Sequence, residues 1–374
     1  MIKKITTMLL IITMTFGMYG CKKEDKNAKN DSLTDKYSQT MLVVPESIKL
    51  EEGFLDEYES LTKVTLPDGY ENDIENITNQ IASFAENKKA KCIIIASDEE
   101  GMLPVFEKIR EKNSTVITVA AGIEEMQIEE KMNDVSVDKS ISMGFNPTDQ
   151  DNPKNAVQMA SAMGAETFVN YINPDMKDNL SIIEKNKELK FECKKAGIKY
   201  EEVNIDEKYK NSIEKFVEQD LKQKINSSSN NINVYASDAE IEKDVVEAAI
   251  NTGAMVSNVH TLDSTALYCD IFDIKVPDTE YIDYSELNRK ISENLKQRNV
   301  EGRFAGTEIP EKVFCIEAAI ETTNKIFEKS GDEYGVFKEM KSNVKKKTGI
   351  LAEYTKVRYD NNFFRAVEMY PILY

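Results

Sequence analysis

The sequence IIIASDEE at residues 93–100 decides the fold, because it recurs in outline as INVYASDAE at residues 232–240. Each copy has an apolar, β-branched run, then Ala-Ser-Asp, then a stretch with helical periodicity. Each helical stretch leads into a second apolar run, at residues 115–120 and 254–259. The pattern predicts two strand–helix–strand units, each with a loop at the carboxyl end of a strand, where open α/β sheets bind ligands.

The same alternation extends in both directions from the repeat. Short apolar runs predict strands, and stretches with apolar residues every three to four positions predict helices. Because strands separated by helices form parallel sheets, the predicted fold class is α/β, with two hinged Rossmann-like lobes whose parallel sheets are flanked by helices. The first lobe is predicted to comprise residues 38–142 plus about 303–330, and the second lobe residues 143–302 plus about 331–374.

The N-terminus is interpreted as a targeting segment. Residues 1–20 contain two lysines followed by an apolar run at residues 5–17, which is too short to span a membrane and is typical of an export signal. Gly20-Cys21 resembles the lipobox of bacterial lipoproteins, which implies cleavage before Cys21 and lipidation of its thiol. Residues 21–37 are rich in Lys, Asp and Asn and are predicted to be a disordered tether. The expected location is therefore extracytoplasmic, with a lipid anchor in the bacterial membrane.

Composition narrows the classes of partner. The net charge is −18, which argues against nucleic acid, since phosphates require a basic face. Four cysteines remain beyond Cys21, without a CxxC motif, and scattered cysteines of this kind are typically small buried hydrophobic residues.

Two loops are the main candidates for ligand binding. Ser97 and Asp98 end the first Ala-Ser-Asp copy, and Ser237 and Asp238 end the second. If the lobes face each other, Asp98 and Asp238 should lie near one shared cavity and accept hydrogen bonds from a ligand. Capping of the following helix explains each aspartate equally well, because Ser and Asp satisfy unpaired N–H groups at a helix start.

Four further residues are weaker ligand candidates. Asn146 lies at the predicted crossover between lobes, and Asn170 and Tyr171 lie at the end of a predicted strand. His260, the only histidine, ends the strand after the second repeat. It could serve as the base of a hydrolase, but no Gly-x-Ser-x-Gly nucleophile elbow accompanies it.

Motifs for bound cofactors do not occur in the chain. There is no Gly-x-Gly-x-x-Gly sequence, no Walker A sequence, and no Cys or His at metal-ligand spacing from His260. We therefore expect no cofactor, no metal and no catalysis.

Residues 93–122 resemble the equivalent segment of type I periplasmic substrate-binding proteins, in which a strand, a loop with Asp, a helix and a strand follow one another. The order of elements is similar over roughly residues 40–330. More narrowly, the chain is similar to a family of bacterial lipoproteins of unassigned function within that superfamily. The resemblance implies two lobes that close on a small ligand, often for delivery to an ABC permease. The region 262–308 and the tail are longer than this family needs.

The leading hypothesis is thus a membrane-tethered solute-binding lipoprotein. Its expected ligand is a small polar molecule, namely a sugar, a nucleoside or an amine-bearing compound. Two alternatives remain: an exported hydrolase that uses His260, and a surface lipoprotein that binds a protein partner.

Overall fold

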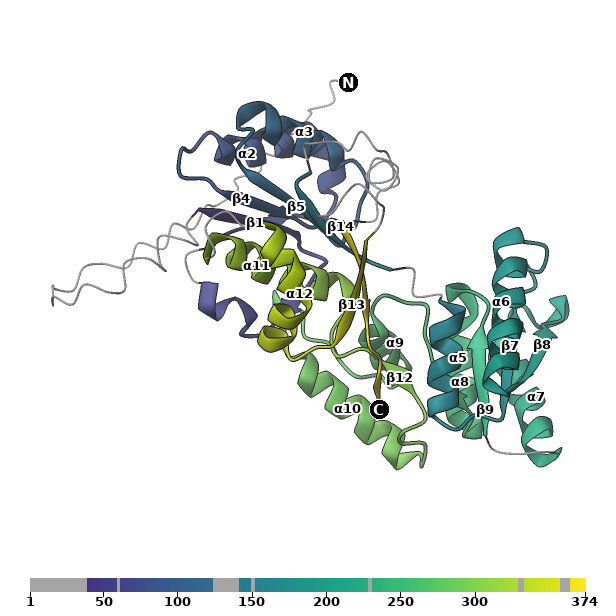
Figure 1. Ribbon diagram of the computed structural model, residues 1–374. Coiled ribbons are helices and arrows are strands. Elements are labelled where there is room, and N and C mark those ends of the chain that lie inside the picture. The colour runs from purple at the N-terminus through teal and green to yellow at the C-terminus, as the bar shows by residue number, and fades with distance from the viewer. Residues whose placement is uncertain are drawn as a thin grey trace, which may run out of the picture.

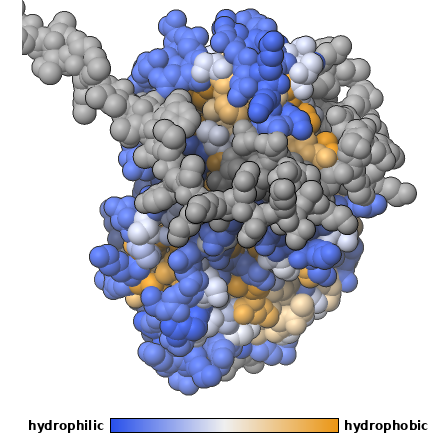
Figure 2. All heavy atoms as spheres, turned by 90° about the vertical axis from the view of Figure 1, so that its left-hand side faces the viewer, coloured by the Kyte–Doolittle hydropathy of each residue, from blue (hydrophilic) through white to orange (hydrophobic). Residues whose placement is uncertain are grey.

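The computed structural model describes residues 39–58, 61–123, 141–148, 152–227, 231–328, 333–356 and 364–374. The predicted signal, Cys21 and the predicted tether lie outside these residues. The residues coloured in Figure 2 are mostly hydrophilic, with small hydrophobic areas between the polar ones. Among the described helices, none has both the length and the apolar character needed to cross a bilayer.

The first lobe is built on a seven-stranded sheet in which every neighbouring pair is parallel except the one at the β13 edge (Figure 1). Helices α2 (Ile74–Ala85) and α3 (Leu103–Lys112) cover one face of the sheet, and α11 (Glu311–Glu328) with α12 (Glu333–Thr348) covers the other. In order across the sheet, the strands are β13 (Ala352–Lys356), β14 (Phe364–Met369), β6 (Met143–Pro147), β5 (Ile117–Ala121), β4 (Cys92–Ile95), β1 (Thr40–Pro45) and β3 (Thr62–Leu66).

The second lobe has a smaller sheet of four parallel strands. Its strands, in spatial order, are β10 (Met255–Val256), β9 (Ile232–Ala236), β7 (Thr167–Ile172) and β8 (Lys199–Asn204). One face packs against α5 and α6, and the other against α7 and α8. These helices span Pro153–Ala162, Leu180–Ala196, Ile213–Ser227 and Glu242–Thr252. The predicted fold class is confirmed in both lobes.

Residues 257–310 form a bridging segment between the two lobes. It contains α9 (Ser264–Ile271) and α10 (Tyr284–Gln297) and two short strands. Strand β11 (Tyr281–Ile282) pairs with β2 (Leu50–Glu51), near the start of the first lobe. Strand β12 (Ala305–Gly306) pairs with the C-terminal β15 (Ile372–Leu373). One hydrophobic cluster therefore runs from the first sheet through the bridging segment into the second lobe.

The predicted boundaries between the lobes need two corrections. Strand β6 lies in the first sheet, although residues from 143 onward were assigned to the second lobe. Strands β13 and β14 also lie in the first sheet, so the assignment of residues 331–374 to the second lobe is wrong for them. The reason is pairing: β14 runs parallel to β6 and extends the sheet begun by the N-terminal half. Gly144 permits this contact, because a Cβ there would lie 1.6 Å from the Phe364 ring.

The cysteines are buried as expected. Cys92, Cys193, Cys269 and Cys315 are all free thiols in the cores of their lobes or of the bridging segment. They act as small apolar side chains, and burial raises the pKa of the Cys92 thiol to about 12.

Candidate functional site

Two cavities lie along the carboxyl edge of the first sheet. The larger one, called here the inter-lobe cavity, has a volume of about 560 Å³, which is within the range of small-molecule sites. The smaller one, called the Asp98 cavity, has a volume of about 230 Å³. The first turn of α11 stands between them, since Glu311 lines the larger cavity whereas Pro310 and Lys312 line the smaller.

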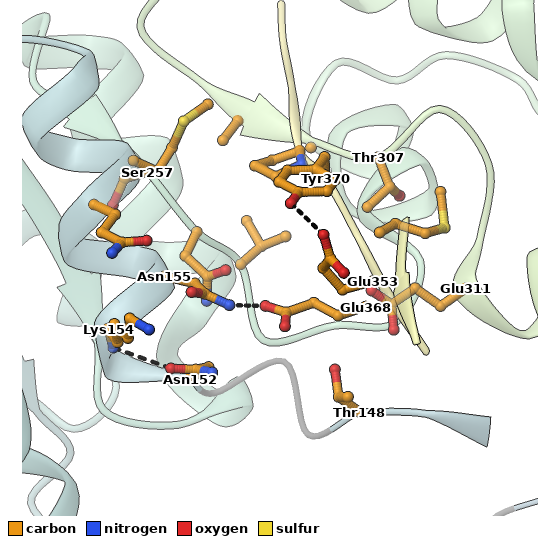
Figure 3. Close-up of a pocket in the computed structure, with 18 of the residues that line it drawn as sticks. Thr148, Asn152, Lys154, Asn155, Ser257, Thr307, Glu311, Glu353, Glu368 and Tyr370 are labelled. Atoms are coloured by element: carbon orange, nitrogen blue, oxygen red, sulfur yellow. Dashed lines mark hydrogen bonds between the residues drawn. The ribbon is translucent and has the colours of Figure 1, made fainter. Parts of the chain in front are cut away.

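The inter-lobe cavity receives walls from both lobes and from the bridging segment (Figure 3). Thr148 follows the carboxyl end of β6, and Ser257 follows the carboxyl end of β10. Helix α5 contributes residues along its whole length, and β13 and β14 contribute the opposite wall. The position agrees with the rule that ligands of open α/β sheets bind outside the carboxyl ends of the strands.

A hydrogen bond crosses this cavity from lobe to lobe. Asn155, on α5, donates its side-chain amide N–H to Glu368 Oε1 on β14 (Figure 3). Burial raises the pKa of Glu368 above its ordinary value, the Glu353 carboxylate adds to the rise, and Lys154 opposes it. The α5 helix is held in place by Asn152, whose side chain accepts a hydrogen bond of 3.1 Å from the backbone N–H of Lys154. Pro153 follows this cap at the first helical position, where its missing N–H leaves no hydrogen bond unmade.

The rim of the cavity on the β13 side has a different electrostatic character. Tyr370 donates a 2.7 Å hydrogen bond to Glu353 Oε1, and Lys341 pairs with the same carboxylate. These contacts hold the pKa of Glu353 below its ordinary value, Lys341 having the larger effect. Glu353 is thus an exposed anion with partners of its own, whereas Glu368 is half-buried inside the cavity.

Two hydroxyl groups in the cavity have unused hydrogen-bonding capacity. The Ser257 side chain is 1% exposed, and its Oγ has no hydrogen-bond partner among the described residues. Thr148 Oγ1 is also buried and has no hydrogen-bond partner among the described residues. Because a buried polar group without a partner costs about 1–3 kcal/mol, such groups indicate a place where a ligand or water is bound.

The Asp98 cavity is lined mainly by apolar side chains of the bridging segment and α11, with Asp98 and Asp263 among the exceptions. Asp98 is engaged on the protein side: Ser47 donates to its Oδ2, and Tyr70 donates to its Oδ1 over 3.1 Å. Ser97 is fully buried and its Oγ accepts a 3.1 Å hydrogen bond from the Glu99 N–H, so it closes the loop locally.

The second Ala-Ser-Asp copy is also used locally. Asp238 Oδ1 accepts hydrogen bonds from the Glu240 N–H and from the Asn173 side chain, at 3.0 and 3.2 Å. Ser237 Oγ accepts from the Asn173 N–H and donates to Asp238. Asp98 lines the smaller cavity, whereas neither described cavity has Asp238 in its lining. The two aspartates therefore do not meet at either cavity.

The remaining predicted residues serve the interior of the lobes. Asn146 is buried and exchanges two hydrogen bonds with the backbone of Ile123, at 2.8 and 3.2 Å. Asn170 donates to Asn186 at 2.7 Å, and Tyr171 donates to Asp220 at 2.8 Å. Both point into the packing between strand and helix, away from the lining of the two cavities.

His260 lies beside the second repeat. Its Nε2 is 2.6 Å from the carbonyl oxygen of Ala236, and its ring packs edge-on against Tyr235 with centroids 4.9 Å apart. The nearby Asp263 caps α9 through the Ala266 N–H at 2.8 Å. The imidazole thus links the ends of β9 and β10, and this contact gives it a structural role in the second lobe.

One cluster of three acidic side chains in the described part of the chain has the spacing of a metal site. Glu214, Asp244 and Glu247, on α7 and α8, have side-chain oxygens within 4.8 Å of one another. Burial is the main cause that raises the pKa values of Asp244 and Glu247. Acidic groups of this kind are common without an ion.

Sequence reasoning missed most of the inter-lobe cavity. Glu368 and Tyr370 belong to the tail and Asn155 belongs to α5, and none of these three was a predicted ligand residue. Ser257 falls inside the apolar run at residues 254–259, whereas the observed β10 ends at Val256 and places Ser257 at its carboxyl end.

Comparisons with known proteins come from solved structures and from a family model, since no curated protein matches the sequence. A protein from Clostridium difficile 630, described as a candidate transcriptional regulator, superposes with a TM-score of 0.73 at 20% identity, covering 90% of this chain and 99% of the other. A sugar ABC transporter protein from Actinomyces odontolyticus ATCC 17982 has a TM-score of 0.45 at 10% identity, covering 79% and 85%. An ABC transporter substrate-binding protein from Desulfitobacterium hafniense, in complex with Leu, has a TM-score of 0.38 at 10% identity, covering 89% and 99%.

The first of these similarities shows a shared fold and carries no information about a ligand, and the other two are too distant to carry an argument. Together with the topology of the two sheets, it confirms the expected α/β fold, in which largely parallel sheets are flanked by helices. The family model that matches covers residues 33–305, which include most of the first lobe, the second lobe and the bridging segment. The chain therefore belongs to the DUF3798 family, which is described as a protein of unknown function.

Proposed function

We propose that the protein is a membrane-tethered, extracytoplasmic solute-binding protein that captures a small polar ligand in the inter-lobe cavity. It acts without catalysis and presents the ligand to an ABC permease or a membrane sensor. The observation that carries this proposal is the buried Ser257 hydroxyl, which has no hydrogen-bond partner in the described part of the chain and lies in a cavity of about 560 Å³ between two lobes. A bound solute would supply the missing hydrogen bond and join the lobes, and closure would be a hinge motion.

The tether follows from the predicted lipobox at Cys21, and the permease or sensor follows from the family resemblance. Both remain proposals that the fold accommodates. The hydrolase alternative receives no comparable support, because His260 contacts the Ala236 carbonyl and lies outside the lining of both cavities.

The absence of tryptophan from the chain allows a direct test. Gln158 is exposed and lines the cavity, so Gln158→Trp places one tryptophan at its mouth. Titration with sugars, nucleosides, amines and amino acids should give a saturable fluorescence change for one class. Phe191→Trp, on the exposed face of α6, is the matched control and should not respond. A panel in which no solute changes the Gln158→Trp signal would contradict the proposed function.

A further inference from the structure

The charged groups that line the inter-lobe cavity are unbalanced. Three carboxylates belong to the lining, from Glu311, Glu353 and Glu368, and one ammonium group, from Lys154. Glu353 is exposed and pairs with Lys341 at the rim, whereas Glu311 and Glu368 are more buried and are called here the inner carboxylates. Lys154 is exposed and is close enough to Glu368 to lower its pKa. The inner part of the cavity is therefore anionic.

The two inner carboxylates lie where ions are costly. Glu311 is 4% exposed, and Glu368 is half-buried. A carboxylate that has lost its hydration favours a nearby cation. Glu311 also lies in the first turn of α11, where the helix dipole stabilises an acid, so its position alone has a second explanation. Glu368 lies in a strand and has no such explanation.

The neutral groups of the lining indicate the rest of the ligand. Ser257 and Thr148 have buried hydroxyl oxygens without a hydrogen-bond partner among the described residues, and Asn258 and Thr307 line the same space. Hydroxyls can donate or accept, so they suit a ligand that is itself hydroxylated. The described lining contains no arginine, the side chain that best binds a carboxylate in two-point fashion.

We propose that the ligand of the inter-lobe cavity carries an ammonium group on a hydroxylated scaffold, with Glu368 and Glu311 binding the ammonium group and Ser257 binding a hydroxyl. This inference rests on the proposed function and specifies its ligand class. It excludes free carboxylates, because these would face the buried Glu311 and half-buried Glu368 carboxyl groups and only one exposed lysine.

The test compares compounds that share a scaffold and carry an ammonium, a hydroxyl or a carboxylate group at one position. One series is 1-amino-1-deoxyglucitol, glucitol and gluconate; a second is ethanolamine, ethylene glycol and glycolate; a third is 5′-amino-5′-deoxyadenosine, adenosine and its 5′-carboxylate. Each is titrated at pH 7 into the Gln158→Trp protein. In at least one series, the ammonium compound should bind about tenfold or more tightly than both relatives, as expected for a hydrogen bond to a charged group. If a neutral or anionic compound binds most tightly, this inference is wrong but the proposed function stands. The same conclusion follows if no ammonium compound binds while another solute does.

Variants in the same background locate the charge recognition. Glu368→Gln and Glu311→Gln should each reduce the preference for the ammonium compound by about tenfold while the affinity for its neutral relative stays the same. Glu184→Gln, an exposed change on α6, should keep the full preference. If both cavity variants fold, as shown by circular dichroism, and retain the preference, the assignment of the ammonium site is wrong.

Discussion

Asn155 of the second lobe and Glu368 of the first lobe are joined by a hydrogen bond inside the inter-lobe cavity (Figure 3). The donor lies on α5, one turn after the crossover from β6, and the acceptor lies on β14, which pairs with β6. The bond therefore links the two lobes close to the segments that connect them. A ligand that enters the cavity meets this bond directly, because both residues belong to the lining.

Removing the donor should loosen the contact between the lobes. In Asn155→Ala, the half-buried Glu368 loses the hydrogen bond that Asn155 donates, and we expect the free energy of unfolding to fall by about 1–3 kcal/mol. Urea unfolding measures this loss, and small-angle scattering should show a larger radius of gyration. Asn152→Ala removes the cap of the same helix without touching Glu368, and it should lower stability but leave the radius unchanged. Equal radii of gyration for the two variants would show that the hydrogen bond between Asn155 and Glu368 does not hold the lobes together.

Acid should weaken binding of an ammonium compound before it unfolds the protein. Burial raises the pKa of Glu368, so this carboxylate takes up a proton at a higher pH than an exposed glutamate. As pH falls through that value, the anion that binds the ammonium group is lost and affinity falls with it. Fluorescence titration of the Gln158→Trp protein between pH 4.5 and 7.5 tests this, provided that circular dichroism shows a folded chain at each pH. Glu368→Gln should flatten the profile, and a profile that is unchanged in this variant would exclude Glu368 as the titrating group.

The fold could be predicted because its signals are local. The β-branched runs of the two repeats and the helical periodicity that follows each of them specify single elements, and the structure confirms these as β4, α3, β9 and α8. The partner of the tail could not be predicted in this way. Strand β14 joins β6 across more than two hundred residues, and what allows this is the absence of a side chain at Gly144 beneath Phe364, a long-range fit that no periodicity reports.

The site shows the same division between local and long-range information. The sequence indicated the carboxyl ends of strands, and Thr148 and Ser257 lie at such ends. The two most prominent aspartates, however, are engaged by neighbouring groups of their own lobes, namely Tyr70 at Asp98 and Asn173 at Asp238. An aspartate that caps a helix and one that binds a ligand look identical in sequence. Only the location of the cavity separates the two roles.

Tyr171 should prove to be a stability residue rather than a ligand residue. Its hydroxyl donates to Asp220 in the packing between β7 and α7, where the ring is fully buried. Tyr171→Phe keeps the ring and removes this bond, so we expect a loss of about 1 kcal/mol in the free energy of unfolding and no change in solute affinity. Urea unfolding and titration of the Gln158→Trp protein measure the two quantities. If Tyr171→Phe lowered the solute affinity and left the free energy of unfolding unchanged, Tyr171 would be a ligand-binding residue.

The junction of β14 with β6 depends on Gly144. A Cβ at this position would overlap the Phe364 ring, which is held in the core of the first lobe. Gly144→Ala should therefore destabilise the protein by about 1–3 kcal/mol, the usual cost of overpacking. The double variant Gly144→Ala/Phe364→Leu should recover part of this loss, because a smaller side chain makes room. Gly164→Ala is not an equivalent control, since Gly164 has a positive φ of 84° and would be strained by a side chain. No destabilisation in Gly144→Ala would show that β14 does not pack on β6 as described.

Alkaline pH should destabilise the junction of β2 with α11. Burial raises the pKa of Glu317 from 4.5 to about 8 and that of Glu51 to about 7. The Glu51 carboxylate adds to the rise at Glu317, and the Asp283 carboxylate adds to the rise at Glu51. Because both pKa values are higher in the folded state than in the unfolded state, the folded protein binds more protons between pH 4.5 and 8, and stability falls as pH rises through this window. Glu317→Gln keeps the shape and removes one ionisable group, so it should raise the free energy of unfolding at pH 8.5 by roughly 1–3 kcal/mol.

At pH 5, where Glu317 is already protonated in the folded protein, the same Glu317→Gln substitution should have little effect. Urea unfolding of both proteins across this range measures the difference, and Glu184→Gln on the exposed face of α6 controls for the change in net charge. A stability difference between Glu317→Gln and the parent that is the same at pH 5 and pH 8.5 would mean that Glu317 does not titrate in this window.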